Sequence, residues 1–298
     1  MSQHLIVGSG PVGSLTALKL AEAGDTVRIV SPSGKGPEHP AVERIALDAN
    51  DTDALTAAAE GAATVFGTAM TPYHLWPETM PQLYSSILTA AECSGADYVL
   101  LNNLYGYSDT SGPISESTAF EPTTRKGRVR AAMWHEAKAA HDAGRVRATE
   151  LRAGQFLGAG AVAAFAWLTA PKVVAGELAL VDGDPDAPHS LSYIGDVADA
   201  LIALARNERS YGRAWNAPVI TTTVREAAAR LAELHGAPAP RLSQVTERDF
   251  ALLAVLAPMF GEFPEMAYMV DEPFTVDDSA IRDTFGLKAS SLDEALAS

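Results

Sequence analysis

The chain has 298 residues, of which 47% are hydrophobic and 20% are charged, and it carries a formal net charge of −15. This composition excludes a disordered protein, because it supplies enough apolar side chains for the core of one large domain or two interleaved domains. The negative charge repels nucleic-acid phosphates and anionic lipid surfaces, so we expect neither a nucleic acid nor a membrane as a partner.

Short apolar runs alternate with amphipathic helical patterns through the first half of the chain. Strands that alternate with helices indicate right-handed crossovers and a parallel sheet covered on both faces, so the expected fold class is α/β, a doubly wound Rossmann sheet. In order, the pattern predicts a strand at 4–8, a helix at 13–23, strands at 26–30 and 43–47, a helix at 52–60, a strand at 63–68, a helix at 80–94, a strand at 97–102, a helix at 125–143 and a strand at 146–152.

The alternation loosens after about residue 155. We expect an Ala-rich helix, a strand near 178–181, a helix near 196–206, and further helices that begin at the capping-box sequences of Thr223 and Ser291. The pattern predicts a dinucleotide-binding domain at 1–155, completed by about 190–218, and a smaller α+β substrate-binding part at 156–189 and 219–298.

A glycine-rich turn follows the first predicted strand and opens the first helix. In such a turn the first glycine permits the bend, the second lets the backbone approach a pyrophosphate, and the third lets the helix pack on its strand. The N-terminus of the helix offers unpaired N–H groups to the anion. The turn therefore predicts dinucleotide binding, against the alternative of an ordinary structural turn. Its residues are Gly8, Ser9, Gly10, Pro11, Val12 and Gly13.

The end of the second strand bears on which dinucleotide binds. A carboxylate there accepts a hydrogen bond from the adenosine ribose and repels the 2′-phosphate of NADP. Here the position is Ser31, and Ser33 and Lys35 follow as donors for a phosphate. We therefore favour NADP over NAD. FAD is a minor alternative, because flavin monooxygenases with a similar turn have Glu where Ser31 stands.

Separated blocks of the sequence resemble the extended and atypical short-chain dehydrogenase/reductases, which include the NAD-dependent epimerases and dehydratases. The resemblance implies that Asp48 and Ala49 hold the adenine. It also implies that the strand end Gly67, Thr68 and Ala69 passes under the cofactor, and family habit implies a homodimer. The blocks lie, in the family's order, at 48–51, 67–69, 102–106, 116, 121–122, 151–158 and 193–200.

The sequence departs from this family at the start of the catalytic helix. Where the family has Tyr-x-x-x-Lys, this chain has Lys126-Gly127-Arg128-Val129-Arg130, and no tyrosine lies between residues 108 and 192. The resemblance implies that Arg130 binds the ribose hydroxyls in place of the family's lysine and that Lys126 takes the place of the tyrosine. The family's catalytic Ser/Thr falls on Asn103 or, in another alignment, near Leu101. We prefer Asn103 because its side chain is polar.

Hydride transfer to a carbonyl needs a donor that stabilises negative charge on oxygen and supplies a proton. Lys126 can serve as that proton donor or as a protonated electrostatic clamp, with Asn103 as a second donor. Tyr105 or Tyr107, after the strand at 97–102, is an alternative source of a hydroxyl. The competing interpretations are a solvated basic helix start at 125–130 and simple packing of the tyrosines.

Four further residues are candidates for the substrate site: His74, Trp76, Gln155 and His189. The first two follow the strand end under the cofactor, Gln155 lies in the block at 151–158, and His189 precedes the block at 193–200. A loop histidine is more often simply exposed. The seven histidines show no metal-binding spacing and no hydrolase nucleophile elbow occurs, so we predict neither a metal site nor a hydrolase.

The cellular setting follows from two observations. The first predicted strand leaves no room for a secretory signal. The single cysteine, Cys93, cannot form an internal disulfide, and we expect it to pack on its helix. The sequence therefore predicts a cytoplasmic protein.

Together these features predict an NAD(P)-dependent oxidoreductase of the atypical extended short-chain type. It would act on a carbonyl or alcohol of a small organic substrate. Two alternatives remain: an NADP(H)-binding sensor without turnover, and an epimerase or lyase that uses a bound cofactor transiently.

Overall fold

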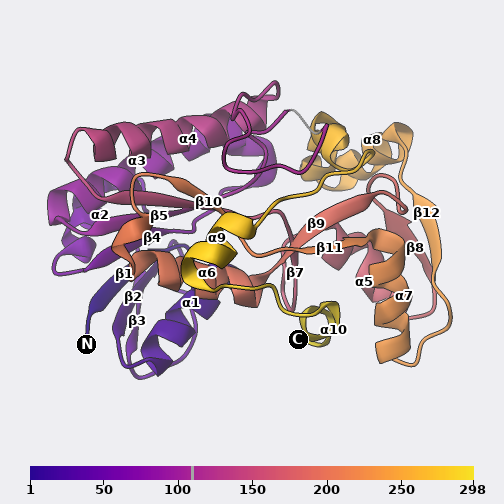
Figure 1. The fold of residues 1–298 in the computed structure, drawn as a ribbon, viewed down its shortest axis with the longest axis horizontal. Coiled ribbons are helices and arrows are strands. Elements are labelled where there is room, and N and C mark those ends of the chain that lie inside the picture. Colours follow the sequence, from indigo (N-terminus) through magenta and orange to yellow (C-terminus); the bar gives the residue numbers. More distant parts are fainter. Residues whose placement is uncertain (109–110) are drawn as a thin grey trace.

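A seven-stranded parallel sheet forms the centre of the computed structural model, which describes residues 1–108 and 111–298 (Figure 1). Its strand order is β10-β6-β5-β4-β1-β2-β3 and every pairing is parallel. The doubly wound α/β fold is thereby confirmed. The strands are β1 (Gln3–Val7), β2 (Thr26–Ser31), β3 (Val42–Ala46), β4 (Thr64–Gly67), β5 (Asp97–Asn102), β6 (Ala148–Arg152) and β10 (Ala214–Asn216).

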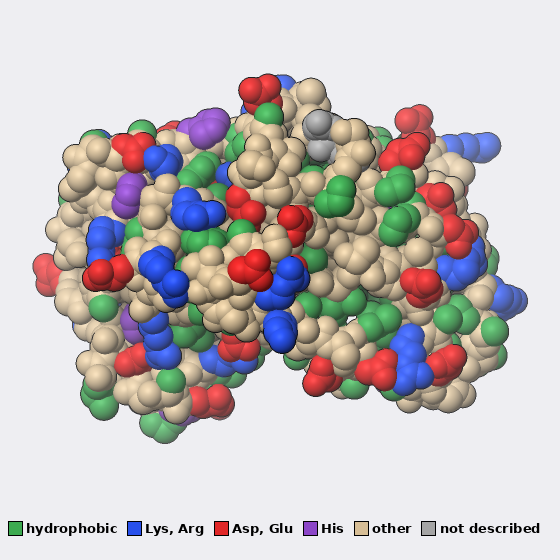
Figure 2. All heavy atoms as spheres, in the orientation of Figure 1, with side chains coloured by type: hydrophobic (Ala, Val, Ile, Leu, Met, Phe, Trp, Pro, Cys, Tyr) green, Lys and Arg blue, Asp and Glu red, His purple; other side chains and the backbone are tan. Residues whose placement is uncertain are grey.

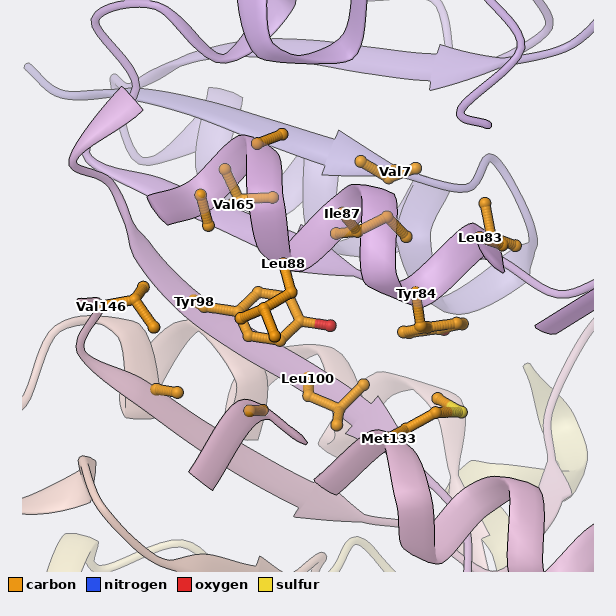
Figure 3. Packing of buried hydrophobic residues seen from close by; sticks show 14 of the residues in the cluster. Val7, Val65, Leu83, Tyr84, Ile87, Leu88, Tyr98, Leu100, Met133 and Val146 are labelled. Carbon is orange, nitrogen blue, oxygen red and sulfur yellow. The ribbon is translucent and has the colours of Figure 1, made fainter. Parts of the chain in front are cut away.

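Helices cover both faces of this sheet. Successive residues of a strand point to opposite faces, and apolar residues on each face pack against helices. Val65 belongs to the core under α2 (Thr52–Ala59), α3 (Trp76–Ser94) and α4 (Arg125–Asp142). Figure 3 shows Val65 among other residues of this core. The next residue, Phe66, belongs to the opposite core with α1 (Pro11–Glu22), α6 (Ile194–Ala205) and α9 (Ser279–Phe285). Both cores are almost entirely apolar, as expected for a sheet buried on two faces.

Two small sheets and several short helices make up the rest of the described chain. One sheet has the order β11-β9-β7, and the other pairs β12 with β8. Their strands are β7 (Gln155–Leu157), β8 (Leu178–Val181), β9 (Pro188–Tyr193), β11 (Ile220–Thr223) and β12 (Arg241–Gln244). The helices are η1 (Tyr73–Leu75), η2 (Phe165–Thr169), α5 (Ala170–Val174), η3 (Glu208–Ser210), α7 (Val224–Leu234), α8 (Glu247–Leu256), η4 (Pro258–Glu262), η5 (Pro264–Met269) and α10 (Leu292–Ala297).

The predicted elements of the first half occur within a few residues of their expected bounds, apart from the start of α3. That helix begins at Trp76 rather than residue 80, because the buried Trp76 anchors its first turn and Pro81 is accommodated inside the helix. The predicted capping boxes at Thr223 and Ser291 are both present.

The predicted Ala-rich helix after residue 155 is present, and it consists of the π-helix η2 continuing directly into α5, with Pro171 in the first turn of α5. One expectation was wrong. Cys93 lies on α3, but its side chain is exposed because it points away from the core. In the described ranges, no helix is long and apolar enough to cross a bilayer.

Candidate active site

The glycine-rich turn connects β1 to α1, and two of its three glycines cannot be replaced without strain. Gly8 has a φ of +114°, and a Cβ atom there would lie 2.6 Å from Ala69. A Cβ on Gly13 would lie 2.1 Å from the Gly8 carbonyl oxygen. Gly10 differs, because a Cβ at that position would meet nothing within 4 Å. The first and third glycines are thus needed for packing, whereas the second borders open space.

The first turn of α1 leaves its amides free. Ser14 is the first residue whose N–H donates back to Gly10, at 2.8 Å, and the N–H groups of Val12 and Gly13 have no hydrogen-bond partner within the described chain. Pro11 contributes no N–H group. Unpaired amides at a helix N-terminus beside an unobstructed glycine form a site suited to a phosphate.

The end of β4 supports this turn. The Thr68 hydroxyl lies 3.1 Å from both the Val7 and the Gly8 carbonyl oxygens, which ties β4 to the end of β1. A residue larger than glycine does not fit at position 67, because its Cβ would come within 2.9 Å of the Tyr98 hydroxyl oxygen. Gly67 and Thr68, with Ala69 packed against Gly8, therefore shape the floor of the turn.

The ribose end of the expected cofactor site begins where β2 ends. Ser31 is buried, and its hydroxyl donates to the Lys35 carbonyl at 2.9 Å, so it closes a turn and has no proton left for a phosphate. Ser33 and Lys35 are exposed. Beyond β3, Asp48 is exposed, and hydrogen bonds from Asn50 lower the pKa of its carboxyl. Ala49 is buried beside it.

The start of α4 buries Lys126 completely against the C-terminal part of the chain. Its Nζ donates to Glu262 and, at 2.8 Å, to Oε2 of Glu265. Glu265 also accepts from the backbone N–H groups of Arg125 and Lys126, so it caps the helix. Although burial opposes it, hydrogen bonds from Lys126 lower the pKa of Glu265. The basic helix start is therefore not solvated at Lys126, contrary to the simpler sequence interpretation.

Two tyrosines join Lys126 to the loop after β5. The Lys126 Nζ lies 4.7 Å from the centre of the Tyr73 ring, and the Tyr73 hydroxyl donates to the Tyr105 hydroxyl at 3.2 Å. Burial raises the pKa of both phenols, which keeps them protonated. Since Tyr105 is the acceptor in this pair, its own proton is free for another acceptor. The loop lies directly on α4, because a Cβ on Gly127 would come within 2.3 Å of the Tyr105 carbonyl oxygen.

Asn103 positions this loop. Its side-chain oxygen accepts from the Tyr105 N–H at 3.1 Å, and its own N–H donates to Asn102 at 2.8 Å. The side-chain oxygen is therefore committed to the turn that carries Tyr105. The amide nitrogen of Asn103 is the part of this residue that can still serve as a donor.

Arg130 lies one helical turn beyond Lys126 and is 5% exposed. Its guanidinium stacks 4.2 Å from the centre of the Trp76 ring, and one terminal nitrogen lies 3.9 Å from the Met70 sulfur. Its Nε has no partner, and no carboxylate in the described chain pairs with this guanidinium. A buried cation without an acid is costly, which indicates a missing hydrogen-bonding group beside it.

A buried polar network lies beneath this site. Glu150 accepts from Asn102 and, at 2.6 Å, from Arg152, whose guanidinium also donates to the Tyr107 hydroxyl at 2.6 Å. Asn102 further donates to the Arg130 carbonyl at 2.9 Å. Tyr107 is completely buried in this network, so it is a structural residue rather than a source of protons.

The four substrate candidates are not brought together. Trp76 is buried under Arg130, and its indole nitrogen donates to the Thr71 carbonyl at 3.0 Å, while His74 is half-buried on η1. Gln155 is half-buried on β7. His189 is buried on β9 with Nε2 3.2 Å from the Glu272 carbonyl oxygen, and burial lowers the pKa of its imidazole. No polar contact links Gln155 or His189 to Lys126 among the described residues.

The sequence analysis missed four residues at this site: Tyr73, Asp182, Glu262 and Glu265. Asp182 follows β8, and burial together with the neighbouring Asp271 raises the pKa of its carboxyl to about 7. The negative charge of this carboxyl is one of the causes that raise the pKa of the Tyr73 and Tyr105 hydroxyls, after burial. Their stretches of sequence carry no motif, so only the fold could reveal them. No group of metal-ligating side chains occurs within residues 1–108 and 111–298.

The sequence matches the model of the NAD dependent epimerase/dehydratase family over residues 5–217, which is most of the chain. The chain belongs to this family. The expected family resemblance is thereby confirmed, and the glycine turn, the β4 floor and the start of α4 all fall inside the matched range. No curated protein matches the sequence.

Solved structures from the epimerase/dehydratase family share the fold. UDP-glucuronic acid 4-epimerase from Bacillus cereus, in complex with NAD, has a TM-score of 0.80 and 16% identity, covering 99% of this chain and 96% of its own. Epimerase Mth375 from Methanothermobacter thermautotrophicus has a TM-score of 0.81 and 18% identity, covering 99% and 90%. DesIV, a dTDP-glucose 4,6-dehydratase from Streptomyces venezuelae, has a TM-score of 0.76 and 18% identity, covering 99% and 96%.

Proposed function

We propose that this family member is an NAD(P)-dependent oxidoreductase that interconverts a carbonyl and an alcohol on a small organic substrate. The observation that carries the proposal is the cluster at the start of α4. There, Lys126, Tyr73 and Tyr105 adjoin one another, and the unpaired Arg130 lies one turn away. Proton donors and a free cation at the carboxyl edge of a parallel sheet are suited to chemistry on a bound dinucleotide.

The residues present fit such a cofactor. The free amides of Val12 and Gly13 would hold its diphosphate beside Gly10, and Arg130 would supply its unused Nε to the ribose hydroxyls. Among the adenosine-side candidates, Ser33 and Lys35 remain as phosphate donors, and no carboxylate ends β2. These features favour NADP, with NAD as the alternative.

The side chains at the site would act on the substrate oxygen. A bound nicotinamide would supply or accept the hydride. In the reducing direction, Tyr105 would donate a hydrogen bond to the carbonyl oxygen, and the Lys126 ammonium would stabilise the negative charge that develops there. The proton on the product hydroxyl would come from Tyr105 or Lys126. Glu262 and Glu265 would hold the ammonium in place, and Asn103 would position the Tyr105 loop.

Replacing Lys126 tests this function. On a substrate that changes the absorbance of the nicotinamide, Lys126→Met should lower kcat roughly 100-fold, because one electrostatic donor in an active site contributes about that much. The dissociation constant of the cofactor should not change. Arg128→Met, on an exposed neighbour, is the matched control and should change neither quantity. An unaltered kcat in the Lys126 variant would contradict the proposed role.

The second candidate function is epimerisation with a transiently used cofactor. It is favoured by the similar structures that are named as 4-epimerases of nucleotide sugars. The two functions differ in one observable. An epimerase releases an isomerised product with no net change in nicotinamide absorbance, whereas an oxidoreductase changes the absorbance in step with product.

A further inference from the structure

A small cavity lies in the substrate-binding part of the molecule. It has a volume of about 100 Å³ and is enclosed by the end of β7, the helices η2 and α5, and the helices α7 and α10. No charged side chain of the described residues lines it, and none of its lining residues belongs to the cluster around Lys126. The cavity is therefore distinct from the groups to which we assign the reaction.

The walls of this cavity are apolar. Four of its lining residues are buried and belong to one hydrophobic core, namely Leu157, Phe165, Leu231 and Ala295. Side chains in a core normally touch other side chains on every side, so a void deprives them of dispersion contacts. Water does not restore these contacts, because a buried water molecule needs polar partners. An apolar molecule that fills the void does restore them.

The backbone of one wall is uncommon. Phe165 and Ala166 belong to the π-helix η2, which runs directly into α5 at Ala170. Turns of π-helix are rare and occur frequently at functional sites. Ala166 and Ala170 both line the cavity, where longer side chains would occupy the space. The unusual backbone and the unfilled space thus occur at the same place, as expected of a binding site.

The cavity opens to solvent at its rim. Ala159 and Ser298 line it and are exposed, and the Ala159 N–H donates to the Ser298 hydroxyl at 3.4 Å. Figure 2 shows a notch at the lower edge of the molecule, between the lobe that carries β1, β2 and β3 and the lobe that carries α7 and α10. Because α10 borders this notch, a small molecule can reach the rim without unfolding of the chain.

We propose that this cavity binds a small, uncharged apolar molecule of about the size of benzene. A cavity of about 150 Å³ lined by Leu, Ile and Phe stays dry and binds benzene or xenon. The present volume of about 100 Å³ has room for one small ring and none for a nucleotide. The site goes beyond the proposed function, because its ligand needs neither a dinucleotide nor turnover in order to bind.

Calorimetry and thermal unfolding with benzene and pyridine, both without cofactor, test the proposal. The two molecules have nearly the same size and shape, but the ring nitrogen of pyridine would lose its hydrogen bond to water. We expect saturable binding of benzene with a dissociation constant of about 1 mM. Pyridine should bind roughly tenfold more weakly. With benzene at about 10 mM, the melting temperature should rise by roughly 2–4 °C.

Three outcomes of these titrations would overturn the proposal. They are the absence of saturable benzene binding, equal affinities for benzene and pyridine, and a melting temperature that falls as benzene is added.

Variants locate the binding in the cavity. Ala170→Leu fills it and should weaken benzene binding at least about tenfold. Ala139→Leu, the same change on an exposed position of α4, is the matched control and should bind benzene as the parent does. If Ala170→Leu does not fold, Ala166→Leu fills the same cavity from the preceding turn and takes its place. An unchanged affinity for benzene in the folded cavity-filling variant would also contradict the proposal.

Discussion

Arg130 is a buried cation that has no carboxylate partner among the described residues and whose Nε makes no hydrogen bond. Stacking on Trp76 offsets part of the desolvation cost, but an ion without an acid partner remains unfavourable. Arg130→Met keeps most of the packing and removes the charge. We expect the free energy of unfolding without cofactor, measured in urea, to stay equal or rise by about 1 kcal/mol. The dissociation constant of the dinucleotide should rise roughly tenfold.

The exposed Arg128 provides the control for this prediction. Arg128→Met should change neither the stability nor the cofactor affinity, because its side chain reaches only the Thr123 carbonyl. If Arg130→Met instead lost stability and kept its cofactor affinity, Arg130 would be a structural residue.

Asp182 predicts a pH dependence of stability. Its folded pKa of about 7 exceeds the ordinary value of 3.8, so the folded state holds this proton more tightly than the unfolded chain does. The resulting stabilisation is complete below pH 3.8 and is lost as the pH rises through 7. Asp182→Asn should therefore be more stable than the parent at pH 8, by about 2 kcal/mol after allowance for residual solvation. Near pH 4 the difference should nearly vanish.

Asp186 gives a control of opposite sign. A hydrogen bond from Arg225 lowers the pKa of its carboxyl, so its contribution is present above the unfolded pKa and is lost at lower pH. Asp186→Asn should therefore not stabilise the protein at pH 8. Chemical denaturation of both variants at the two pH values decides between a local effect of Asp182 and a general effect of net charge.

Lys126 also shows where reasoning from sequence reaches its limit. Its place on a helix near Arg130 follows from local signals, namely the Thr124 cap and the residue spacing. Local signals do not reveal its partners, because Glu262 and Glu265 lie 136 and 139 residues away on short 3₁₀-helices. Short helices of this kind are fixed by tertiary contacts, which leave no periodic pattern in the sequence.

At the scale of elements, the network beneath the site joins β5, β6 and α4. Removing one partner of a buried ion pair leaves the other charge uncompensated. Arg152→Met should therefore lower the free energy of unfolding by about 3 kcal/mol, because Glu150 would keep only Asn102 as a partner. Thermal or urea denaturation measures this loss.

Arg147 is the matched control for the network. Its side chain is 53% exposed and pairs with the half-buried Asp97 and the exposed Glu208. Arg147→Met should cost about 1 kcal/mol or less, as exposed ion pairs usually do. An equal decrease in the free energy of unfolding in the two variants would show that the buried network contributes no more to stability than an ion pair at the surface.

The elements of the parallel sheet could be predicted because each has its own local signal. β1, the glycine turn and α1 follow one another within 22 residues, and each apolar run is bounded by turn residues. The π-helical geometry of η2 and the strands β7 and β12 could not be predicted in this way. They are short, and they are set by partners distant in sequence, as in the pairing of β12 with β8.

At the scale of the whole molecule, the site lies where the central sheet meets the acidic C-terminal half. The turn after β1 supplies the glycines, α4 supplies Arg130, and the C-terminal half supplies Glu262, Glu265 and Asp182. Figure 1 shows α4 and the C-terminal helix α8 on the same side of the molecule. The sheet was predictable from sequence together with the family resemblance. The placement of these three carboxylates could not be predicted, because they become neighbours of the site only when the C-terminal half packs against the central sheet and its helices.

Gly10 allows the central claim to be tested without disturbing the fold. Its φ of −68° and ψ of 176° suit any residue, and a side chain there would enter open space where the diphosphate is expected. Gly10→Val should therefore fold normally and exclude the cofactor. Gly112→Val is the control, because a Cβ on Gly112 would also meet no atom within 4 Å and this glycine lies far from the turn in sequence.

The most direct measurement is a calorimetric titration of the parent, Gly10→Val and Gly112→Val with NADPH and with NADH. We predict saturable binding to the parent and to Gly112→Val, and an affinity at least about 100-fold weaker for Gly10→Val at an unchanged melting temperature. Failure of the parent to bind either nucleotide, or equal binding to Gly10→Val, would contradict the account.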